Sequence, residues 1–242
     1  MDVAMPDGKT RAVFFDAGET LLHPHPSFSQ LFLDTCAGYG FMPEEWMVLG
    51  LARELMSEVE ERQRGGFTFT TDPSLSRSFW MSFYRRMLRE LGWSGSDALS
   101  GEIYRAFSDP GNYRLYPDAE QAVRELSSRG LLLGVISNFE PWLEELLARL
   151  GISGLFEVIC ISGKLGVEKP DVRIFRMALQ EAGVEASKAW HVGDSLKTDV
   201  QGARDAGMIP VLLDRSGRHA DAECIRIEDL RRLPEIIDGG SG

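Results

Sequence analysis

The chain has 242 residues, of which 43% are hydrophobic and 26% are charged, a composition typical of a globular protein with enough apolar material for a sizeable core. Its formal net charge is −11 and its basic residues form no cluster, so we expect no nucleic-acid partner, because such binding needs Lys and Arg to neutralise phosphates. Three widely spaced cysteines predict neither a disulfide framework nor a thiolate metal site. The N-terminal stretch lacks the apolar core of a signal peptide, and no apolar run approaches the ~20 residues of a membrane-spanning helix. We therefore expect a cytoplasmic protein that does not enter a membrane.

The first predicted element is a short buried strand in the stretch RAVFFD, which ends on Asp16. The chain then breaks into Ala-Gly-Glu-Thr, with Gly18 two residues after the aspartate. A hydrophobic strand that ends on a carboxylate marks Asp16 as a candidate functional residue.

The segment from residue 23 to residue 115 predicts helices and no strand. Pro43 begins a run with apolar residues at helical spacing, and the run stops at Gly65. We expect helices over residues 43–64, 72–91 and 96–109. His23 and His25 are each followed by proline, which favours an extended hinge or linker over metal ligands.

After residue 116 helices and strands alternate. Apolar runs predict strands over residues 131–137, 156–162, 189–194, 208–214 and 224–229. Helices of this length between strands predict an α/β fold, in which a mostly parallel sheet is covered on both faces. We place the core in residues 1–22 and 116–242, and an inserted all-helical domain in residues 23–115.

Polar residues follow several predicted strands at the point where each strand ends. These residues are Asp16, Ser137, Asn138, Lys169, Asp194, Ser195 and Asp199. Any one of them alone could be a helix cap or a turn former. Together they would meet beyond the carboxyl ends of parallel strands, where α/β sheets bind ligands. Carboxylates that converge there repel one another unless a cation lies among them, and Mg²⁺ suits oxygen ligands of this kind.

Four motifs in order resemble those of the haloacid dehalogenase superfamily of hydrolases. They are VFFDAGETLL, VISN, GVEKPDVRIF and HVGDSLKTDVQGARDAGM. The fourth motif is long and specific, and the set covers most of the chain. The resemblance implies a Rossmann-like core and, for the helical insertion, a C1-type cap of subfamily I. It also implies a small phosphorylated metabolite as substrate, acted on by a monomer or a homodimer.

The resemblance implies a catalytic role for Asp16 as the nucleophile that forms an aspartyl-phosphate, which water then hydrolyses. It also implies that Mg²⁺ is held by Asp16, by the backbone carbonyl of Gly18 and by Asp194, with Asp199 in or near the next layer of contacts. The ion would neutralise charge on the transferring group.

The same resemblance implies that three further residues bind the phosphoryl group. Ser137 and the amide of Asn138 would donate hydrogen bonds to its oxygens. Lys169 would pair with both Asp16 and the phosphoryl group as a fixed positive charge.

Gly18 departs from the pattern of the family's phosphatases, which carry a second aspartate at this position. That aspartate protonates the leaving oxygen and then deprotonates the attacking water. A positioned acid–base group supplies ~10²–10⁴-fold in rate, so this chain should be slow, or limited to leaving groups that need little protonation. Glu19, one residue along, is the candidate that could compensate.

Three interpretations stay open at this stage: a Mg²⁺-dependent phosphatase-like hydrolase, a non-catalytic protein that binds a phosphorylated ligand or a protein partner, and a metal-free 2-haloacid dehalogenase. Gly18 suits the dehalogenase, but Asp194 beside Asp16 makes sense with a cation and is awkward without one. Aromatic residues of the insertion, Trp80 and Tyr84 among them, could line a pocket, although their helical spacing favours packing.

Overall fold

The structure, a computed structural model, describes residues 10–239. Its centre is a six-stranded sheet in which each neighbouring pair of strands is parallel. The strands are β1 (Ala12–Phe15), β4 (Leu132–Ser137), β5 (Val158–Ile161), β6 (Ala189–Gly193), β7 (Ile209–Leu213) and β8 (Ile225–Ile227). Their order across the sheet is β5-β4-β1-β6-β7-β8. Because the chain builds outward from β1 in one direction and then returns to its other side, β1 and β6 flank a topological switch point.

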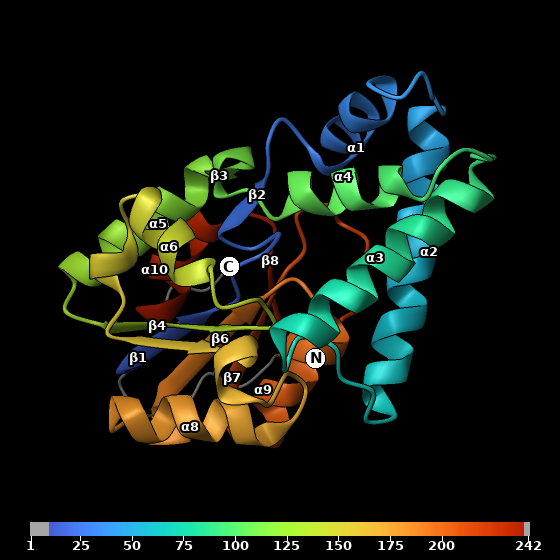
Figure 1. Cartoon of the computed structure of the whole chain (residues 1–242). Coiled ribbons are helices and arrows are strands. Elements are labelled where there is room, and N and C mark those ends of the chain that lie inside the picture. Colours follow the sequence, from blue (N-terminus) through green and yellow to red (C-terminus); the bar gives the residue numbers. More distant parts are fainter. Residues whose placement is uncertain (1–9, 240–242) are drawn as a thin grey trace.

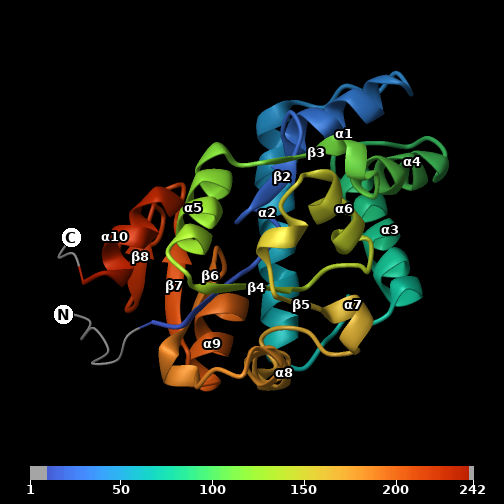
Figure 2. The same ribbon diagram turned by 90° about the vertical axis from the view of Figure 1, so that its left-hand side faces the viewer.

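Side chains of β1 alternate between the two faces of the sheet, as a strand requires. Val13 and Phe15 pack with α5 (Pro117–Ser128), α6 (Leu143–Arg149) and α10 (Leu233–Ile237). Ala12 and Phe14 pack with α8 (Val172–Ala182) and α9 (Gln201–Asp205). Figure 2 shows these helix layers on opposite faces of the sheet, and a short helix, α7 (Ser162–Leu165), follows β5. The predicted α/β fold with a mostly parallel, doubly covered sheet is confirmed.

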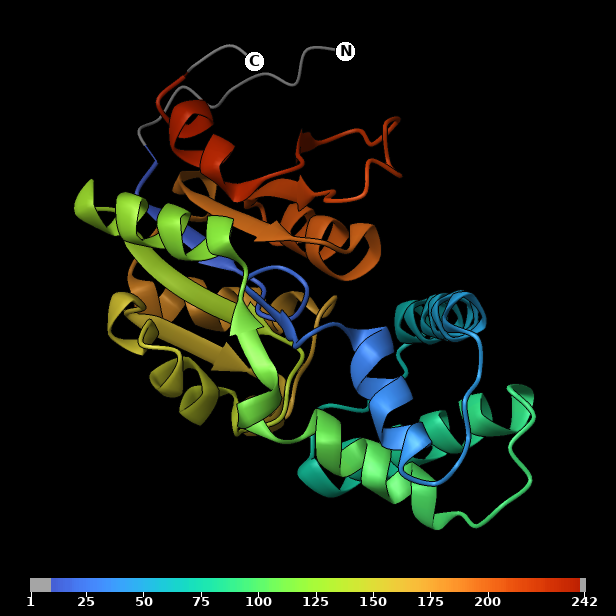
Figure 3. The same ribbon diagram turned by 90° about the horizontal axis from the view of Figure 1, so that it is seen from above.

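The segment inserted after β1 forms a second cluster of helices with its own buried core. It contains α1 (Phe28–Ala37), α2 (Glu45–Arg64), α3 (Pro73–Glu90) and α4 (Ala98–Phe107). The sequence analysis did not delimit α1, which begins after the Ser27 cap. Figures 1 and 3 show these four helices, called the cap from here on, beyond the carboxyl ends of the sheet strands. They therefore stand over the edge of the sheet where the candidate residues gather.

A two-stranded antiparallel ribbon joins the sheet to the cap. It pairs β2 (Leu22–Pro24) with β3 (Tyr113–Leu115). The expectation of no strand between residues 23 and 115 is therefore wrong at both ends of that segment. Each strand has three residues and its partner lies far away in the sequence, so neither has the local pattern that would reveal it. His23 lies within this ribbon, with its ring 4.5 Å from that of Tyr116, which fits a connecting role.

The three cysteines, Cys36, Cys160 and Cys224, are buried and free. Burial raises the pKa of the Cys36 and Cys160 thiols to about 12, so these thiols stay protonated and pack as small apolar groups. Within residues 10–239, each helix is too short or too polar to cross a membrane.

Candidate active site

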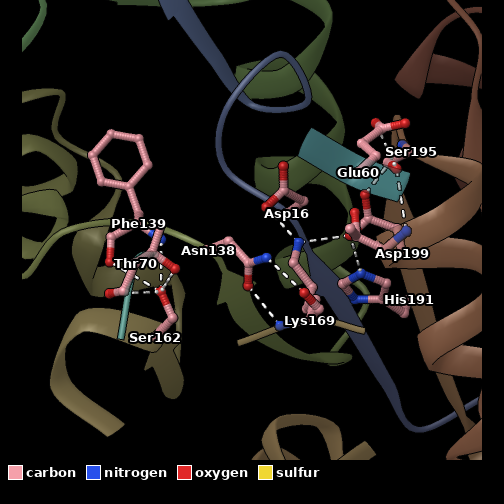
Figure 4. Close-up of polar contacts among 11 residues, drawn as sticks. Asp16, Glu60, Thr70, Asn138, Phe139, Ser162, Lys169, His191, Ser195 and Asp199 are labelled. Carbon is pink, nitrogen blue, oxygen red and sulfur yellow. Dashed lines mark hydrogen bonds and ion pairs between the residues drawn. The ribbon is translucent and has the colours of Figure 1, made fainter. Parts of the chain in front are cut away.

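The centre of the site is a buried lysine between two aspartates. Lys169 Nζ donates hydrogen bonds to Asp16 Oδ1 and to Asp199 Oδ1, each at 2.6 Å (Figure 4). The exposed fractions are 2% for Lys169, 8% for Asp16 and 1% for Asp199. The three residues come from the end of β1, from the loop before α8 and from the segment after β6. The sequence prediction that they meet at one edge of the sheet agrees with this geometry.

The charges of this cluster fix its protonation. Burial alone would lower the pKa of Lys169, but the Asp16 and Asp199 carboxylates outweigh it and raise that pKa above its usual range. Burial works against ionised Asp199 too, yet Lys169 and His191 lower the pKa of Asp199 below its usual value. Burial raises the pKa of Asp16, which the Lys169 ammonium opposes. The lysine is thus a fixed positive charge beside the candidate nucleophile.

Both carboxylate oxygens of Asp199 accept hydrogen bonds. This residue lies in a π-helical turn, Leu196–Val200, directly after β6, and such turns are frequent at functional sites. Its Oδ2 accepts from the Ser195 amide at 3.1 Å, and its Oδ1 accepts from His191 Nε2 at 2.9 Å in addition to Lys169. A Cβ on Gly193 would come within 2.2 Å of Asp199 Cγ, so only glycine lets this carboxylate approach.

Asp16, Asp194 and Asp199 form a cluster whose oxygens all lie within 4.8 Å of one another. Asp194 is on the solvent-exposed side of the cluster. Crowding by protein atoms and the negative charges of Asp16 and Asp199 raise the pKa of Asp194 well above its usual range. These carboxylate oxygens fit Mg²⁺, which would relieve their mutual repulsion. Because both oxygens of Asp199 already accept hydrogen bonds, Asp16 and Asp194 are better placed to bind the ion directly.

Ser137 and Asn138 end β4 beside this cluster. The Ser137 side chain is 2% exposed, and its hydrogen bond to Asp16 favours the ionised form of that carboxyl group. The Asn138 side chain donates to the Lys169 carbonyl at 2.8 Å and accepts from the Lys169 amide at 2.7 Å. This side chain therefore positions the backbone of the lysine.

Gly18 and Glu19 face the space between cap and core. Among the described residues, no heavy atom lies within 4 Å of the place that a Cβ would take on Gly18. Glu19 has a φ of 54°, in the left-handed region that side chains rarely adopt, and its Oε2 accepts a hydrogen bond from the Tyr116 hydroxyl at 2.8 Å. The space for an acidic side chain at residue 18 is thus present, while Glu19 is bound to Tyr116.

The sequence analysis missed a buried carboxylate next to the lysine. Glu168 is 2% exposed, and its oxygens accept hydrogen bonds from Gln63 Nε2 at 2.9 Å, the Phe69 amide at 3.1 Å, the Thr70 amide at 2.7 Å and the Thr70 hydroxyl at 2.6 Å. All four donors belong to the end of α2 or to the loop between α2 and α3. The residue before Lys169 therefore ties the cap to the core, and its position in the GVEKP motif was the only sequence signal that could have indicated this.

A second contact between cap and core lies on the other side of the cluster. The Ser195 hydroxyl donates to Glu60 Oε1 at 3.2 Å (Figure 4). Lys197 Nζ lies 3.5 Å from Glu60 Oε2. Glu60 belongs to the last turns of α2. Helix α2 thus contacts two residues of the short segment that leads to Asp199.

A cavity of about 480 Å³ opens between cap and core. Gly18, Glu19 and Asn138 line it from the core, and Trp80 and Tyr84 line it from α3. We call it the cap–core cavity. For Trp80 and Tyr84 the interpretation as packing residues alone is therefore wrong, because one face of α3 both packs within the cap and forms a wall of this cavity.

The two phenylalanines of the loop between α2 and α3 pack against neighbouring side chains. The Phe69 ring is 4% exposed and lies 3.9 Å from that of Phe79. The Phe67 ring lies under the Arg62 guanidinium at 3.9 Å.

Comparison with known proteins gives one family. The model of the haloacid dehalogenase-like hydrolases matches residues 10–207. A phosphoserine phosphatase from Thermus thermophilus is 40% identical over 155 residues, which cover 62% of this chain and 61% of that protein. The match thus spans less than two thirds of that relative. A glyceraldehyde 3-phosphate phosphatase from Methanothermobacter thermautotrophicus is 33% identical over 244 residues, which cover 94% of this chain and 99% of that protein.

Solved structures agree on the fold. A magnesium-bound HAD hydrolase from Bacillus subtilis, YfnB, has a TM-score of 0.78 at 18% identity, covering 96% of this chain and 100% of that one. Solved 2-haloacid dehalogenases also share the fold. The fold by itself therefore does not choose between phosphoester and carbon–halogen chemistry.

Proposed function

This chain belongs to the haloacid dehalogenase-like hydrolase family, and we propose that it is a Mg²⁺-dependent phosphatase that forms an aspartyl-phosphate on Asp16. The observation that carries the proposal is the buried Asp16–Lys169 pair, 2.6 Å apart, with Asp194 in the same cluster of carboxylates. Relatives named as phosphatases of phosphoserine and of glyceraldehyde 3-phosphate support a small phosphorylated substrate.

In the first step an Asp16 carboxylate oxygen would attack the phosphorus atom. A bond forms between that oxygen and phosphorus, the bond from phosphorus to the leaving oxygen breaks, and its electron pair stays on the leaving oxygen. The Lys169 ammonium, the Ser137 hydroxyl and the Asn138 backbone amide would stabilise the oxygens of the transferring group. The Asn138 side chain supports this step indirectly, because it fixes the backbone of Lys169.

In the second step water would attack phosphorus and release Asp16. The new bond joins the water oxygen to phosphorus, the bond to Asp16 breaks with its electron pair returning to the carboxylate, and one water proton passes to solvent while the other stays on the inorganic phosphate. Mg²⁺ bound by Asp16, Asp194 and the Gly18 carbonyl would shield the negative charges that meet in both steps. Asp199 would hold Lys169 in place.

Gly18 limits which substrates react fast. With no carboxyl group at residue 18, the leaving oxygen must depart with little protonation. A positioned acid supplies ~10²–10⁴-fold, equivalent to about 3–5 kcal/mol of barrier. Acyl and aryl phosphates, whose leaving groups are stable as anions, should therefore react faster than alkyl phosphates.

The direct test is turnover of acetyl phosphate and p-nitrophenyl phosphate with and without Mg²⁺. We expect turnover that EDTA abolishes, and a phosphoryl group on the peptide that contains Asp16 after acid quench and mass spectrometry. Asp16→Asn should remove both signals while the protein stays folded by circular dichroism.

Each alternative interpretation has its own signature in this test. Tight binding of a phosphorylated ligand by a folded protein that turns over neither compound would support the non-catalytic interpretation. Halide release from a 2-haloacid in the presence of EDTA would support the dehalogenase. The carboxylate cluster of Asp16, Asp194 and Asp199 speaks against the dehalogenase. Without a metal ion, Lys169 is the one lysine or arginine among residues 10–239 that forms an ion pair with these carboxylates.

We further propose that the enzyme works in the cytoplasm, a reducing compartment that suits its three free cysteines.

A further inference from the structure

The cap–core cavity is larger and more apolar than a small polar metabolite needs. At about 480 Å³ it falls within the range of pockets that enclose drug-sized ligands, ~300–1,000 Å³. It begins at Gly18 and Asn138, the positions next to the candidate nucleophile and its supporting lysine. A leaving group attached to phosphorus at Asp16 would therefore extend into this space.

Aromatic rings form the wall of the cavity on the cap side. Trp80 stacks on Tyr84 with ring centroids 5.8 Å apart, and Tyr84 stacks on Phe107 at 5.5 Å. All three residues line the cavity. Tyr84 and Phe107 are 4% and 8% exposed and support the half-buried Trp80 from behind, and aromatic rings prefer offset or edge contacts with another ring.

The core side of the cavity has the same character. Phe139 and Trp142 pack edge to face with centroids 4.7 Å apart, and Trp142 contacts Tyr113 at 5.6 Å. These residues also line the cavity. A ligand between the two walls would meet aromatic surface from both the cap and the core.

Four charged residues, Glu19, Arg53, Glu140 and Arg218, are among those that line the cavity. Glu140 is 9% exposed, and its carboxylate accepts hydrogen bonds from the Tyr104 hydroxyl at 3.1 Å and from Trp142 Nε1 at 2.7 Å. A buried carboxylate repels a second anionic group on the substrate. Arg53 and Arg218 line the cavity with exposed side chains, where they can attract a phosphorylated compound without entering the apolar part.

From the walls of this cavity and from Gly18 we infer that the substrate class is an aryl phosphate whose leaving group is an uncharged, multi-ring phenol. This inference rests on the proposed phosphatase function and adds the identity of the leaving group. The two observations are independent and select the same chemistry. Aromatic walls favour a ligand with rings. The absence of an acid favours a leaving oxygen whose conjugate acid has a low pKa, which is about 10 for a phenol such as tyrosine and about 15.7 for water, the reference for a non-aromatic hydroxyl group.

The bond changes of the reaction balance without any further reactant. Asp16 displaces the phenol oxygen from phosphorus, and the aryloxide leaves with the electron pair of the broken bond and takes a proton from solvent. Water then hydrolyses the aspartyl-phosphate to inorganic phosphate.

The first experiment compares kcat/KM for 2-naphthyl phosphate, phenyl phosphate and glycerol 3-phosphate in Mg²⁺. The second ring should raise kcat/KM by about tenfold over phenyl phosphate through the apolar surface that it buries, and glycerol 3-phosphate should be the poorest substrate. Equal values for naphthyl and phenyl phosphate would overturn the inference while leaving the phosphatase function intact.

A pair of tryptophan variants locates the effect in the cavity. Trp80→Leu should lower the ratio of kcat/KM for 2-naphthyl phosphate over acetyl phosphate by about tenfold, because it removes one ring of the cap wall. Trp46→Leu is the matched control, since Trp46 lies on α2 and is 72% exposed, and it should leave the ratio unchanged. A drop of the same size in both variants would refute the assignment.

A binding measurement separates this inference from the proposed function. Calorimetry should show that 2-naphthylphosphonic acid, which cannot be hydrolysed, binds at least tenfold more tightly than methylphosphonic acid. Preferential binding without turnover of any phosphate ester would keep the ligand class and reject the phosphatase. Turnover with no preference for the naphthyl compound would do the reverse.

Discussion

Two neighbouring regions of the molecule are built from different kinds of residue: the cluster of charged side chains at the edge of the sheet, called the rim from here on, and the cap–core cavity. At the rim, Asp16, Lys169 and Asp199 are each at least about nine-tenths buried and held by charged hydrogen bonds. In the cap–core cavity, aromatic rings such as Trp80 and Phe107 dominate. The rim can change little without loss of its charge balance, whereas the cavity can change a ring and keep its apolar character.

This difference indicates how the work is divided. In the proposed mechanism the rim would supply a nucleophile with a cation beside it, which suits any phosphate ester, and the cavity would supply the surface that recognises the leaving group. The two meet at Gly18, where the space for an acidic side chain is open. Under this proposal the choice of substrate would depend both on the acid that is missing at residue 18 and on the aromatic surface of the cavity.

The largest effect on stability and activity is expected from removing the lysine of the rim. Lys169→Met leaves Asp16 and Asp199 buried without their shared cation, which should cost about 3–5 kcal/mol in the free energy of unfolding and lower kcat by about 10²–10³-fold. Urea denaturation and steady-state kinetics measure the two effects. The control is Lys164→Met, whose exposed pair with Glu144 at 2.6 Å should be worth about 1 kcal/mol or less. Equal losses of unfolding free energy and of kcat in the two variants would show that the buried ion pairs of Lys169 contribute no more than an exposed pair.

The second largest effect is expected from restoring an acidic side chain at residue 18, where the rim meets the cavity. In Gly18→Asp the new side chain has room, so kcat for an alkyl phosphate such as glycerol 3-phosphate should rise by about 10²-fold, with a smaller gain for aryl phosphates. Gly154→Asp, at an exposed glycine that is equally open, controls for the added charge. An unchanged rate in Gly18→Asp would mean that proton supply does not limit this enzyme.

The contact between the two regions is the next target. Glu168→Gln leaves buried amide donors of the cap loop partly unpaired, which should lower the free energy of unfolding by about 2 kcal/mol and speed hydrogen exchange at Phe69 and Thr70. Glu60→Gln, at the more exposed contact with Ser195, should cost about 1 kcal/mol or less. If exchange at Phe69 and Thr70 stays slow in Glu168→Gln, the cap is held by other contacts.

The smallest effect concerns acid stability of the loop that carries Arg218 to the cavity. Burial would raise the pKa of Asp214, but the His219 and Arg218 amides and the Arg226 guanidinium outweigh it and lower that pKa from 3.8 to about 2. Since the folded pKa is depressed, this stabilisation is present above pH 3.8 and is lost as the pH falls towards 2. The free energy of unfolding should therefore fall more steeply between these pH values in the wild type than in Asp214→Asn. Parallel curves would exclude the carboxylate as the cause.

The sequence was a good guide to the rim and a poor guide to the cavity. Asp16, Lys169 and Asp194 could be predicted because each directly follows a strand or precedes a helix, and parallel strands bring such ends together. The roles of Asn138 and Glu168 could not, because their side chains pair with segments 31 and about 100 residues away. The β2–β3 ribbon and the aromatic walls were not predicted for the same reason. Contacts between segments far apart in the chain leave no repeating pattern in the local sequence.

The most direct measurement of the central claim is the leaving-group dependence of the wild type. Phenyl phosphates of similar size, substituted to span leaving-group pKa values, keep the contacts of the cavity nearly constant while the need for protonation changes. We predict that log kcat/KM falls steeply as the leaving-group pKa rises, because Gly18 provides no acid. A flat line would contradict this account and would mean that another residue, with Glu19 the nearest carboxyl group in sequence, donates the proton.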